Sequence, residues 1–322
     1  MPAKSSSSAA PEVTVVIPTR NRRQLLSRAL ASVLAQEDVA IEVIVVDDAS
    51  ADGTLERING LDDERVRLLR NETPRGPAAA RNQAIDLARA PWLGFLDDDD
   101  LWAPRKLREQ LDLAADDVVL VDSGHLSLDE QGRVLARFPG SDDAEKELLR
   151  RDVFGTSGVI VRTDAVRAVG GFDESLQVVE DWDLWIRLLG SGRMIACHDP
   201  LWACTLTSSA ASINPAENLA GTKRLLIKHA SLGIDVDLAS SASWVATGQR
   251  RAGHRLWAAR TLLSSGLRYR SPRNVARGLA LILLGESGMR AQRRIRQPRL
   301  ERPGWLDPER KGTPEQENRA GL

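Results

Sequence analysis

The sequence has few cysteines, few tyrosines and no long apolar run. Cys197 and Cys204 are the only cysteines among 322 residues, and they can build neither a disulfide framework nor a four-cysteine zinc site. The apolar stretch at 279–284 is far shorter than the ~18 residues of a membrane-spanning helix. Residues 1–11 lack the apolar centre of a secretory signal. We therefore expect a cytoplasmic protein with reduced thiols, not a membrane-embedded one.

Charge is distributed unevenly along the chain. Residues 244–322 contain 17 Lys/Arg and 6 Asp/Glu, whereas residues 1–243 contain 27 and 39. The formal net charge of the whole chain is only −1. An acidic body therefore carries a basic C-terminal segment, which indicates different tasks for the two parts.

Short apolar segments alternate with helical patterns between residues 13 and 122. The predicted strands are 13–17, 41–46, 66–69, 92–96 and 118–121, and the predicted helices are 21–35, 78–90 and 104–115. This alternation favours an α/β fold with a mostly parallel, Rossmann-like central sheet and helices on both faces. Further along, the pattern predicts a hairpin over 124–138, strands at 157–161 and 194–197, and a helix at 181–189.

The same patterns divide the chain into four parts. We predict a disordered leader at 1–11, an α/β domain at 12–214, a basic helical region at 215–296 and a disordered tail at 297–322. Trp and Arg on the basic helices suit an anionic membrane surface. A partner-binding helix and an ordinary solvated face are the alternatives. No nucleic-acid-binding motif occurs, so we expect no nucleic-acid partner.

Four consecutive aspartates, Asp97 to Asp100, directly follow the strand predicted at 92–96. Ligands of open parallel sheets bind beyond the carboxyl ends of the strands. Crowded carboxylates repel one another unless a cation lies among them, and oxygen ligands suit Mg²⁺ or Mn²⁺ bridging to phosphates. The alternative is a solvated acidic turn before the helix that begins near Pro104.

Other polar residues occupy comparable positions. Asp47 and Asp48 follow the strand predicted at 41–46, where a carboxylate can accept a base N–H or a ribose hydroxyl. The alternative for this segment is a helix cap, which Ser50 and Asp52 can supply, but Asp47 and Asp48 are more than a cap requires. Arg75 precedes, and Arg81 lies within, a helix opened by a Gly/Pro turn, an arrangement that can bind an anion. For Arg81 alone, a surface salt bridge is equally compatible.

Acidic residues at the predicted helix 181–189 alternate with two tryptophans. A carboxylate at the start of this helix, beside Trp182 and Trp185, can be held partly dry, which suits a general base. For Asp183 we favour simple complementation of the helix dipole. Spaced three residues apart, the tryptophans are more typical of a core than of a substrate platform.

Six segments in this order resemble a family 2 glycosyltransferase with the GT-A fold: VVIPTRNR, VVDDAS, RGPAAARN, FLDDDDLW, GGFDE and EDWDLWIRL. The resemblance extends over about 190 residues, from Val13 to Pro200. It implies an inverting, metal-dependent transfer from a nucleoside-diphosphate sugar of UDP, dTDP or GDP type. The implied acceptor is a hydroxyl of a glycan or lipid-linked precursor in cell-envelope polysaccharide biosynthesis. No Gln-x-x-Arg-Trp motif or spanning helix occurs, which implies a non-processive enzyme.

The resemblance also assigns residues to roles. The donor-binding residues it implies are Pro18, Thr19, Asn21, Asp47, Asp48, Arg75, Arg81, Asp97 and Asp98. Either Asp47 or Asp48 contacts the base, and Arg75 or Arg81 faces the base or the diphosphate. Asp99, with Asp97, ligates Mn²⁺ or Mg²⁺, and Asp181 is the catalytic base.

This sequence departs from many relatives after the last predicted strand. Residues 202–207 contain neither the histidine nor the arginine of a segment that closes over the diphosphate, and Ser208, Ser209 and Ser212 are candidates for a mobile lid instead. Two alternatives stay open: a non-catalytic nucleotide-sugar-binding relative and a sugar-1-phosphate nucleotidyltransferase. The latter needs a glycine-rich loop, which 18–23 lacks. A homodimer and peripheral contact with the inner membrane face also stay open.

Overall fold

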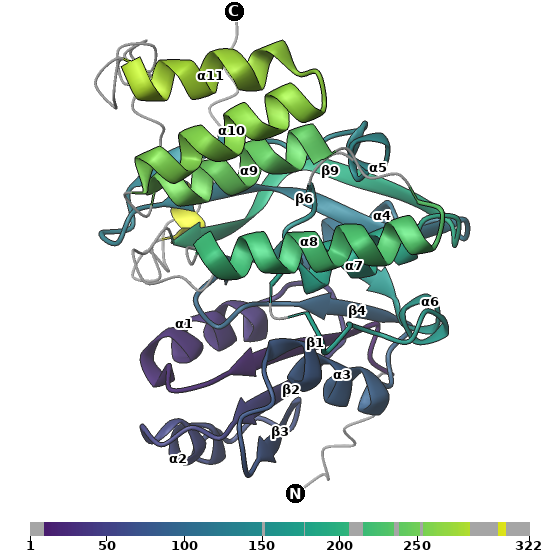
Figure 1. Ribbon diagram of the computed structural model, residues 1–322. Helices are drawn as coiled ribbons and strands as arrows, with labels where there is room; N and C mark the ends of the chain where they lie inside the picture. Colours follow the sequence, from purple (N-terminus) through teal and green to yellow (C-terminus); the bar gives the residue numbers. More distant parts are fainter. Residues whose placement is uncertain are drawn as a thin grey trace, which may run out of the picture.

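The computed structural model describes residues 10–149, 152–176, 178–205, 215–234, 238–251, 254–283 and 302–306. Within this part a nine-stranded sheet forms the centre of the molecule, in the order β3-β2-β1-β4-β8-β6-β9-β5, with β7 beside β6 (Figure 1). The strands are β1 Val13–Thr19, β2 Ile41–Asp48, β3 Val66–Asn71, β4 Trp92–Phe95, β5 Leu101–Trp102, β6 Val118–Leu128, β7 Val134–Phe138, β8 Ile160–Arg162 and β9 Arg193–Thr205.

The predicted α/β fold is confirmed, and the sheet is mixed. β3, β2, β1 and β4 run parallel, as βαβ units require. β8 is antiparallel to both β4 and β6, and β6 and β9 are parallel again. Two strands are longer than the sequence pattern predicts, because β6 continues into the expected hairpin and β9 continues through 202–205. Pairing with β5 keeps this end of β9 extended.

Helices cover both faces of the sheet. They are α1 Arg23–Leu34, α2 Thr54–Asn59, α3 Pro77–Leu87, α4 Lys106–Asp112, α5 Ala144–Glu147, α6 Thr163–Ala168, α7 Glu180–Arg187, α8 Pro215–Ser231, α9 Leu238–Arg251, α10 Arg255–Arg268 and α11 Pro272–Leu283. Two 3₁₀ turns complete the described elements, η1 Thr156–Gly158 and η3 Gly304–Leu306. A helix that covers the sheet packs against it with one apolar face, as α1 illustrates. The buried residues of α1 fall on one stripe of the helix: Leu26, Ala29, Leu30 and Val33.

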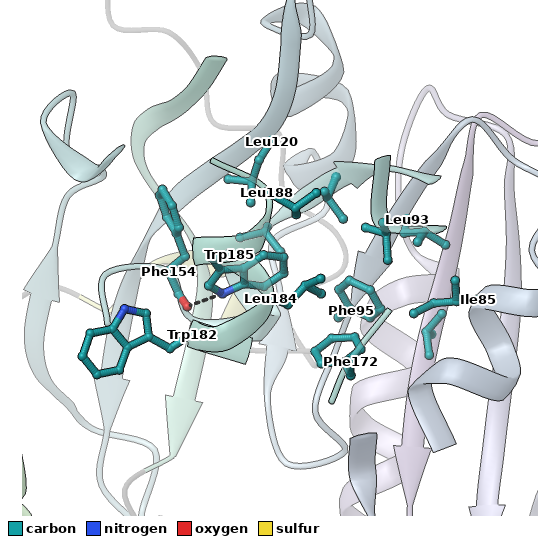
Figure 2. Packing of buried hydrophobic residues seen from close by; sticks show 14 of the residues in the cluster. Ile85, Leu93, Phe95, Leu120, Phe154, Phe172, Trp182, Leu184, Trp185 and Leu188 are labelled. Carbon is teal, nitrogen blue, oxygen red and sulfur yellow. Dashed lines mark hydrogen bonds between the residues drawn. The ribbon is translucent and has the colours of Figure 1, made fainter. Parts of the chain in front are cut away.

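Two apolar clusters fill the spaces between the helices and the two faces of the sheet. Trp185 is central to one of them, and Phe95 and Phe172 meet edge to face beside it, with ring centroids 5.2 Å apart (Figure 2). The Trp185 indole donates to the Phe154 carbonyl over 3.3 Å. Trp182 and Trp185 are fully buried, so the expectation that they belong to the core is confirmed.

α8 packs as part of the body, although the sequence pattern places it with the basic region beginning at residue 215. Leu225 is buried in the same cluster as Trp185. Asp183 is also fully buried and accepts hydrogen bonds from Lys228 at 2.9 Å and His229 at 3.0 Å. Asp183 therefore does not merely complement a helix dipole, because it anchors α8 to α7.

The remaining C-terminal helices form a layer of their own. α9, α10 and α11 share a small core of Ala246, Ala258, Ala259, Leu262 and Leu281. They lie at the end of the molecule opposite β3 (Figure 1).

In the tail predicted to be disordered, residues 302–306 are described, and Leu306 is buried against Leu126 and Leu128 of β6. Residues 1–9 of the leader and Ser208, Ser209 and Ser212 lie outside the described residues. No helix of the described part is long and apolar enough to cross a bilayer.

Candidate active site

The acidic loop at Asp97 to Asp100 lies at the carboxyl end of β4, where the sheet order predicts a ligand site. Two of its carboxylates bind the loop that follows β1. Asp98 accepts hydrogen bonds from the Thr19 hydroxyl at 2.7 Å and from Arg22 Nη1 at 3.1 Å. The same Arg22 nitrogen donates to Asp99 Oδ2 at 2.6 Å. The loop is therefore held by specific pairs and is not a solvated acidic turn.

Arg81 connects the acidic loop to the start of α7. Its Nη2 donates to Asp97 Oδ1 at 2.7 Å, and its Nη1 donates to Glu180 Oε1 at 2.8 Å. Arg81 is almost fully buried, so it is not the surface salt bridge that the sequence leaves open. Both of its terminal nitrogens are occupied by these carboxylates. Arg81 thus joins the predicted metal motif to the residue next to Asp181.

The 3₁₀ turn η1 forms a second connection between the same regions. The Thr156 hydroxyl donates to Asp181 Oδ2 at 2.7 Å. The next residue, Ser157, donates to Asp100 Oδ2 at 2.6 Å and accepts from the Asp97 backbone N–H at 3.1 Å. Two adjacent hydroxyls therefore set the spacing between the candidate base and the acidic loop.

The start of α7 carries backbone strain. Val179, the residue before Glu180, has φ +60 and ψ 19, a left-handed conformation that is rare for a β-branched residue. Strained backbone of this kind is often found at functional sites. It places Glu180 and Asp181 side by side in the first turn of the helix.

Burial changes the acidity of these carboxyl groups. It raises the pKa of Asp98 to about 6, although Thr19 and Arg22 act against the rise. Burial likewise raises the pKa of Glu180 to about 6, opposed by Arg81. The pKa of Asp181 is also raised by burial, and the Thr156 hydrogen bond partly offsets this. A carboxylate with a raised pKa is a better proton acceptor near neutral pH.

The two aspartates at the end of β2 have separate partners. Asp47 is fully buried and accepts from Arg70 Nη1 at 2.6 Å and from the Ser50 backbone N–H at 3.0 Å. Asp48 accepts from the backbone N–H groups of Arg75 and Gly76, at 2.8 and 2.9 Å. Asp48 therefore shapes the turn that opens α3. The contact of either residue with a nucleotide base stays a prediction.

The other predicted donor-binding residues lie around the same edge of the sheet. Pro18 is buried inside β1. Asn21 has φ +54, and its side-chain oxygen accepts from the Ala51 N–H at 2.8 Å, which ties the loops after β1 and β2 together. The Arg75 side chain is half exposed and lies 3.6 Å from Glu174. All these residues are thus gathered at one edge, and their donor contacts stay predictions.

The segments RGPAAARN and GGFDE, distant in sequence, lock together. The Asn82 side chain donates to the Phe172 carbonyl at 2.9 Å and accepts from the Phe172 N–H at 2.8 Å. Gly171 has φ +69, and a Cβ atom there would lie 2.5 Å from Asn82 Oδ1. Only glycine fits this approach, which brings the segment before α7 close to α3.

A divalent cation fits the chemistry of the acidic loop, although the described residues show no preformed cage of three or more His, Cys, Asp or Glu side chains. Among those residues, one oxygen each of Asp97 and Asp99 accepts no hydrogen bond. Both side chains are partly exposed. Mg²⁺ and Mn²⁺ typically use one or two carboxylates and take their other ligands from phosphates and water. Asp97 and Asp99 can therefore hold such a cation together with a diphosphate.

A cavity of about 960 Å³ opens between α1 and α2. Ser50 and Arg70 line it, and both residues contact Asp47. It therefore adjoins the end of β2 but is not lined by the acidic loop.

Several residues of the site are missed by sequence reasoning. Arg22 and Glu180 lie inside the segments VVIPTRNR and EDWDLWIRL, but no sequence pattern assigns either residue a role in the site. Their charge is the feature of the sequence that could have identified them. Thr156 and Ser157 carry no signal in the sequence, because a hydroxyl pair in a Gly-Thr-Ser-Gly turn is common. Their roles depend on which distant side chains they meet.

Residues 14–161 match the family described as Glycosyl transferase family 2. This segment of the chain therefore resembles that family, and the residues outside it are not matched. The succinoglycan biosynthesis protein ExoO of Rhizobium meliloti is 35% identical over 199 residues, covering 56% of this chain and 57% of the relative. The UDP-Glc:alpha-D-GlcNAc-diphosphoundecaprenol beta-1,3-glucosyltransferase WfgD of Escherichia coli is 27% identical over 187 residues, covering 58% and 73%. The chain thus matches little more than half the length of ExoO.

A solved structure shares the fold. The mannosyltransferase PcManGT of Pyrobaculum calidifontis, in complex with GDP-Man and Mn²⁺, aligns with a TM-score of 0.59 and 20% identity. The alignment covers 89% of this chain and 85% of PcManGT. The chain therefore has the GT-A fold.

Proposed function

We propose that this chain is an inverting, metal-dependent glycosyltransferase that moves a sugar from a nucleoside-diphosphate sugar to a hydroxyl acceptor. The observation that carries the proposal is the link made by Arg81 between Asp97 and Glu180. It connects the candidate metal motif to the residue that precedes the candidate base, Asp181. The match of residues 14–161 to Glycosyl transferase family 2 supports the same reaction class.

The donor is a nucleotide sugar held along the carboxyl edge of β1, β2 and β4. The names of two similar proteins support this class, since one uses UDP-Glc and the other binds GDP-Man. Thr19 and Asn21 place the loop after β1 over the acidic loop and the end of β2. Arg22 and Arg75 supply positive charge on the two sides of this edge, and both retain exposed surface for an anionic donor.

Asp99 and Asp97 are the residues that would hold Mn²⁺ or Mg²⁺. When bound, the cation offsets the negative charge that develops on the nucleoside diphosphate as it leaves. The chain also contributes its own charge: Arg81 stays close to Asp97, and Arg22 lies beside Asp99. These guanidinium groups orient the carboxylates and reduce the repulsion within the acidic loop.

Asp181 accepts the proton of the acceptor hydroxyl. Burial raises its pKa, so its carboxylate binds a proton more readily than an exposed aspartate does. Thr156 and the Trp182 backbone N–H each donate to one of its oxygens, at 2.7 and 2.8 Å, which orients the group. Attack by the acceptor oxygen on the face opposite the leaving diphosphate inverts the anomeric centre.

The acceptor is a lipid-linked glycan or its polysaccharide product, in cell-envelope polysaccharide biosynthesis. The names of ExoO and WfgD support this class, because the first refers to succinoglycan and the second to a diphosphoundecaprenol-linked sugar. A cytoplasmic location at the inner membrane face fits such an acceptor and stays a prediction.

A nucleotide-release screen tests the proposal. Purified protein is incubated with Mn²⁺ and a panel of UDP, dTDP and GDP sugars, and we expect one nucleotide class to be released. Asp181→Asn should retain donor affinity within a few-fold while turnover falls ~10²–10⁴-fold. Asp164→Asn, an exposed aspartate on α6, is the matched control and should behave like wild type.

Three outcomes would contradict the proposal. Donor binding without any turnover supports the non-catalytic relative. Pyrophosphate release from a sugar-1-phosphate and a nucleoside triphosphate supports the nucleotidyltransferase. Collapse of donor affinity in Asp181→Asn assigns Asp181 to donor binding.

A further inference from the structure

The C-terminal helices carry uncompensated positive charge. Residues 238–283 contain neither Asp nor Glu but include eight arginines, at positions 250, 251, 255, 260, 268, 270, 273 and 277. The structure describes the side chains of all of these arginines except Arg251, and none of those described forms an ion pair with a carboxylate. Besides burial, the positive charges of Arg273 and Arg250 lower the pKa of Arg277.

Large apolar side chains are exposed at one end of the α10–α11 hairpin. Leu256 and Trp257, at the start of α10, are 70% and 58% exposed, and Leu283, at the end of α11, is 78% exposed. Arg255 holds these two helix ends together, because its Nε donates to the Leu281 carbonyl at 2.6 Å and its Nη2 to the Ile282 carbonyl at 2.8 Å. The exposed leucines and Trp257 therefore belong to the same tip.

The hairpin does not need these side chains for its own packing. Its small core lies between the helices, where Gly278 is so close to Leu263 that a Cβ atom would lie 2.7 Å from the leucine side chain. Gly266 approaches Val275 in the same way. The hairpin is thus tightly packed, and the large apolar side chains at its tip are exposed. The hairpin lies at the end of the molecule opposite β3 (Figure 1).

We infer that the α10–α11 hairpin, together with Arg250 at the end of α9, is a docking surface for an anionic lipid bilayer. Leu256, Trp257 and Leu283 enter the interfacial region, and the arginines lie against anionic headgroups. The inference rests on the proposed function for its purpose, since a bilayer is where a lipid-linked acceptor is found. A nucleic acid would use the charge but leave the leucine tip in water, so the bilayer accounts for both features.

Vesicle flotation with the full chain tests the charge. Wild type should float with vesicles of phosphatidylcholine and phosphatidylglycerol at low salt, and should not float with phosphatidylcholine alone. Arg250→Gln/Arg273→Gln/Arg277→Gln should bind on the order of 100-fold more weakly, at about fivefold per arginine. The control Arg133→Gln/Arg137→Gln/Arg193→Gln removes the same charge from exposed positions on the body and should bind like wild type.

A second pair of variants tests the apolar tip. Trp257→Ser/Leu283→Ser should weaken vesicle binding at least tenfold and leave a remainder that disappears at high salt. Leu87→Ser/Leu135→Ser removes exposed apolar groups of the body and is the control. Circular dichroism and thermal melting of each variant establish that it is folded.

The results separate this inference from the proposed function, because donor hydrolysis in solution is measured on every folded variant. Loss of flotation with unchanged hydrolysis supports the bilayer surface. If the wild-type protein hydrolyses the donor but does not float with the vesicles, the inferred bilayer surface is wrong and the proposed function stands. Equal weakening by the body control, or tighter binding to duplex RNA than to vesicles without dependence on Trp257 and Leu283, overturns it as well.

Discussion

Arg22 Nη1 lies 2.6 Å from Oδ2 of Asp99, the carboxylate that we propose as the direct cation ligand. The same nitrogen lies 3.1 Å from Asp98. A guanidinium and a divalent cation on one carboxylate repel each other, so cation binding at the other oxygen of Asp99 would weaken its contact with Arg22. An arginine whose contact is weakened in this way is well placed to bind a donor phosphate.

This relationship predicts opposite effects of one substitution on two ligands. In Arg22→Gln, Mn²⁺ binding without donor should tighten several-fold, because a competing positive charge is removed. Nucleotide-sugar affinity should fall in the same variant. Titration calorimetry with each ligand measures both effects, and Arg20→Gln, an exposed neighbour, is the control. Weaker Mn²⁺ binding in Arg22→Gln would show that Arg22 supports the cation site.

Removal of the cation ligand should abolish activity without unfolding the protein. Asp99→Ala deletes a partly exposed carboxylate, so the melting temperature should stay near that of wild type while turnover disappears. Excess chelator should have the same effect on wild type, and added Mn²⁺ should reverse it. Asp116→Ala, at an exposed position, is the control. Full turnover in chelator would rule out the metal requirement.

The Thr156 hydroxyl should tune the pH dependence of turnover. Asp181 must be ionised to act as a base, so activity is lost as pH falls through its pKa, which burial raises. The Thr156 hydrogen bond lowers that pKa, and Thr156→Val removes the bond without changing the side-chain volume much. The acidic limb of the kcat profile should therefore move to higher pH. An unchanged limb, with donor affinity also unchanged, would exclude Asp181 as the titrating base.

The Asp183 cluster should contribute to stability at low pH. Although burial opposes it, hydrogen bonds from His229 and Lys228 lower the pKa of Asp183 to about 2. A lowered carboxyl pKa means stability that is complete above the unfolded value of about 3.9 and is lost as pH falls towards 2. The change should amount to about 2 kcal/mol. Denaturant unfolding between pH 5 and 2 measures it, and Asp183→Asn should flatten this pH dependence whereas Asp164→Asn should not.

The sequence by itself determined the framework of this protein. Strands such as 13–17 and 41–46 are apolar runs that only a buried sheet explains, and the observed strands β1 and β2 contain them. The positions of Asp47 and Asp97 at the ends of strands follow from the same local pattern. Because side chains at the carboxyl ends of parallel strands share one edge, the site could be located before any contact was known.

Tertiary structure alone decided which charged groups meet. Arg81 and Glu180 are 99 residues apart, and Lys228 lies 45 residues beyond Asp183, so no local pattern connects them. The same is true of Thr156 and Asp181, whose contact depends on how the turn η1 lies against the start of α7. The local sequence around a charged residue does not show whether its side chain is exposed to water or paired with a buried partner. Only close packing, which makes an unpaired buried charge costly, selects the partner.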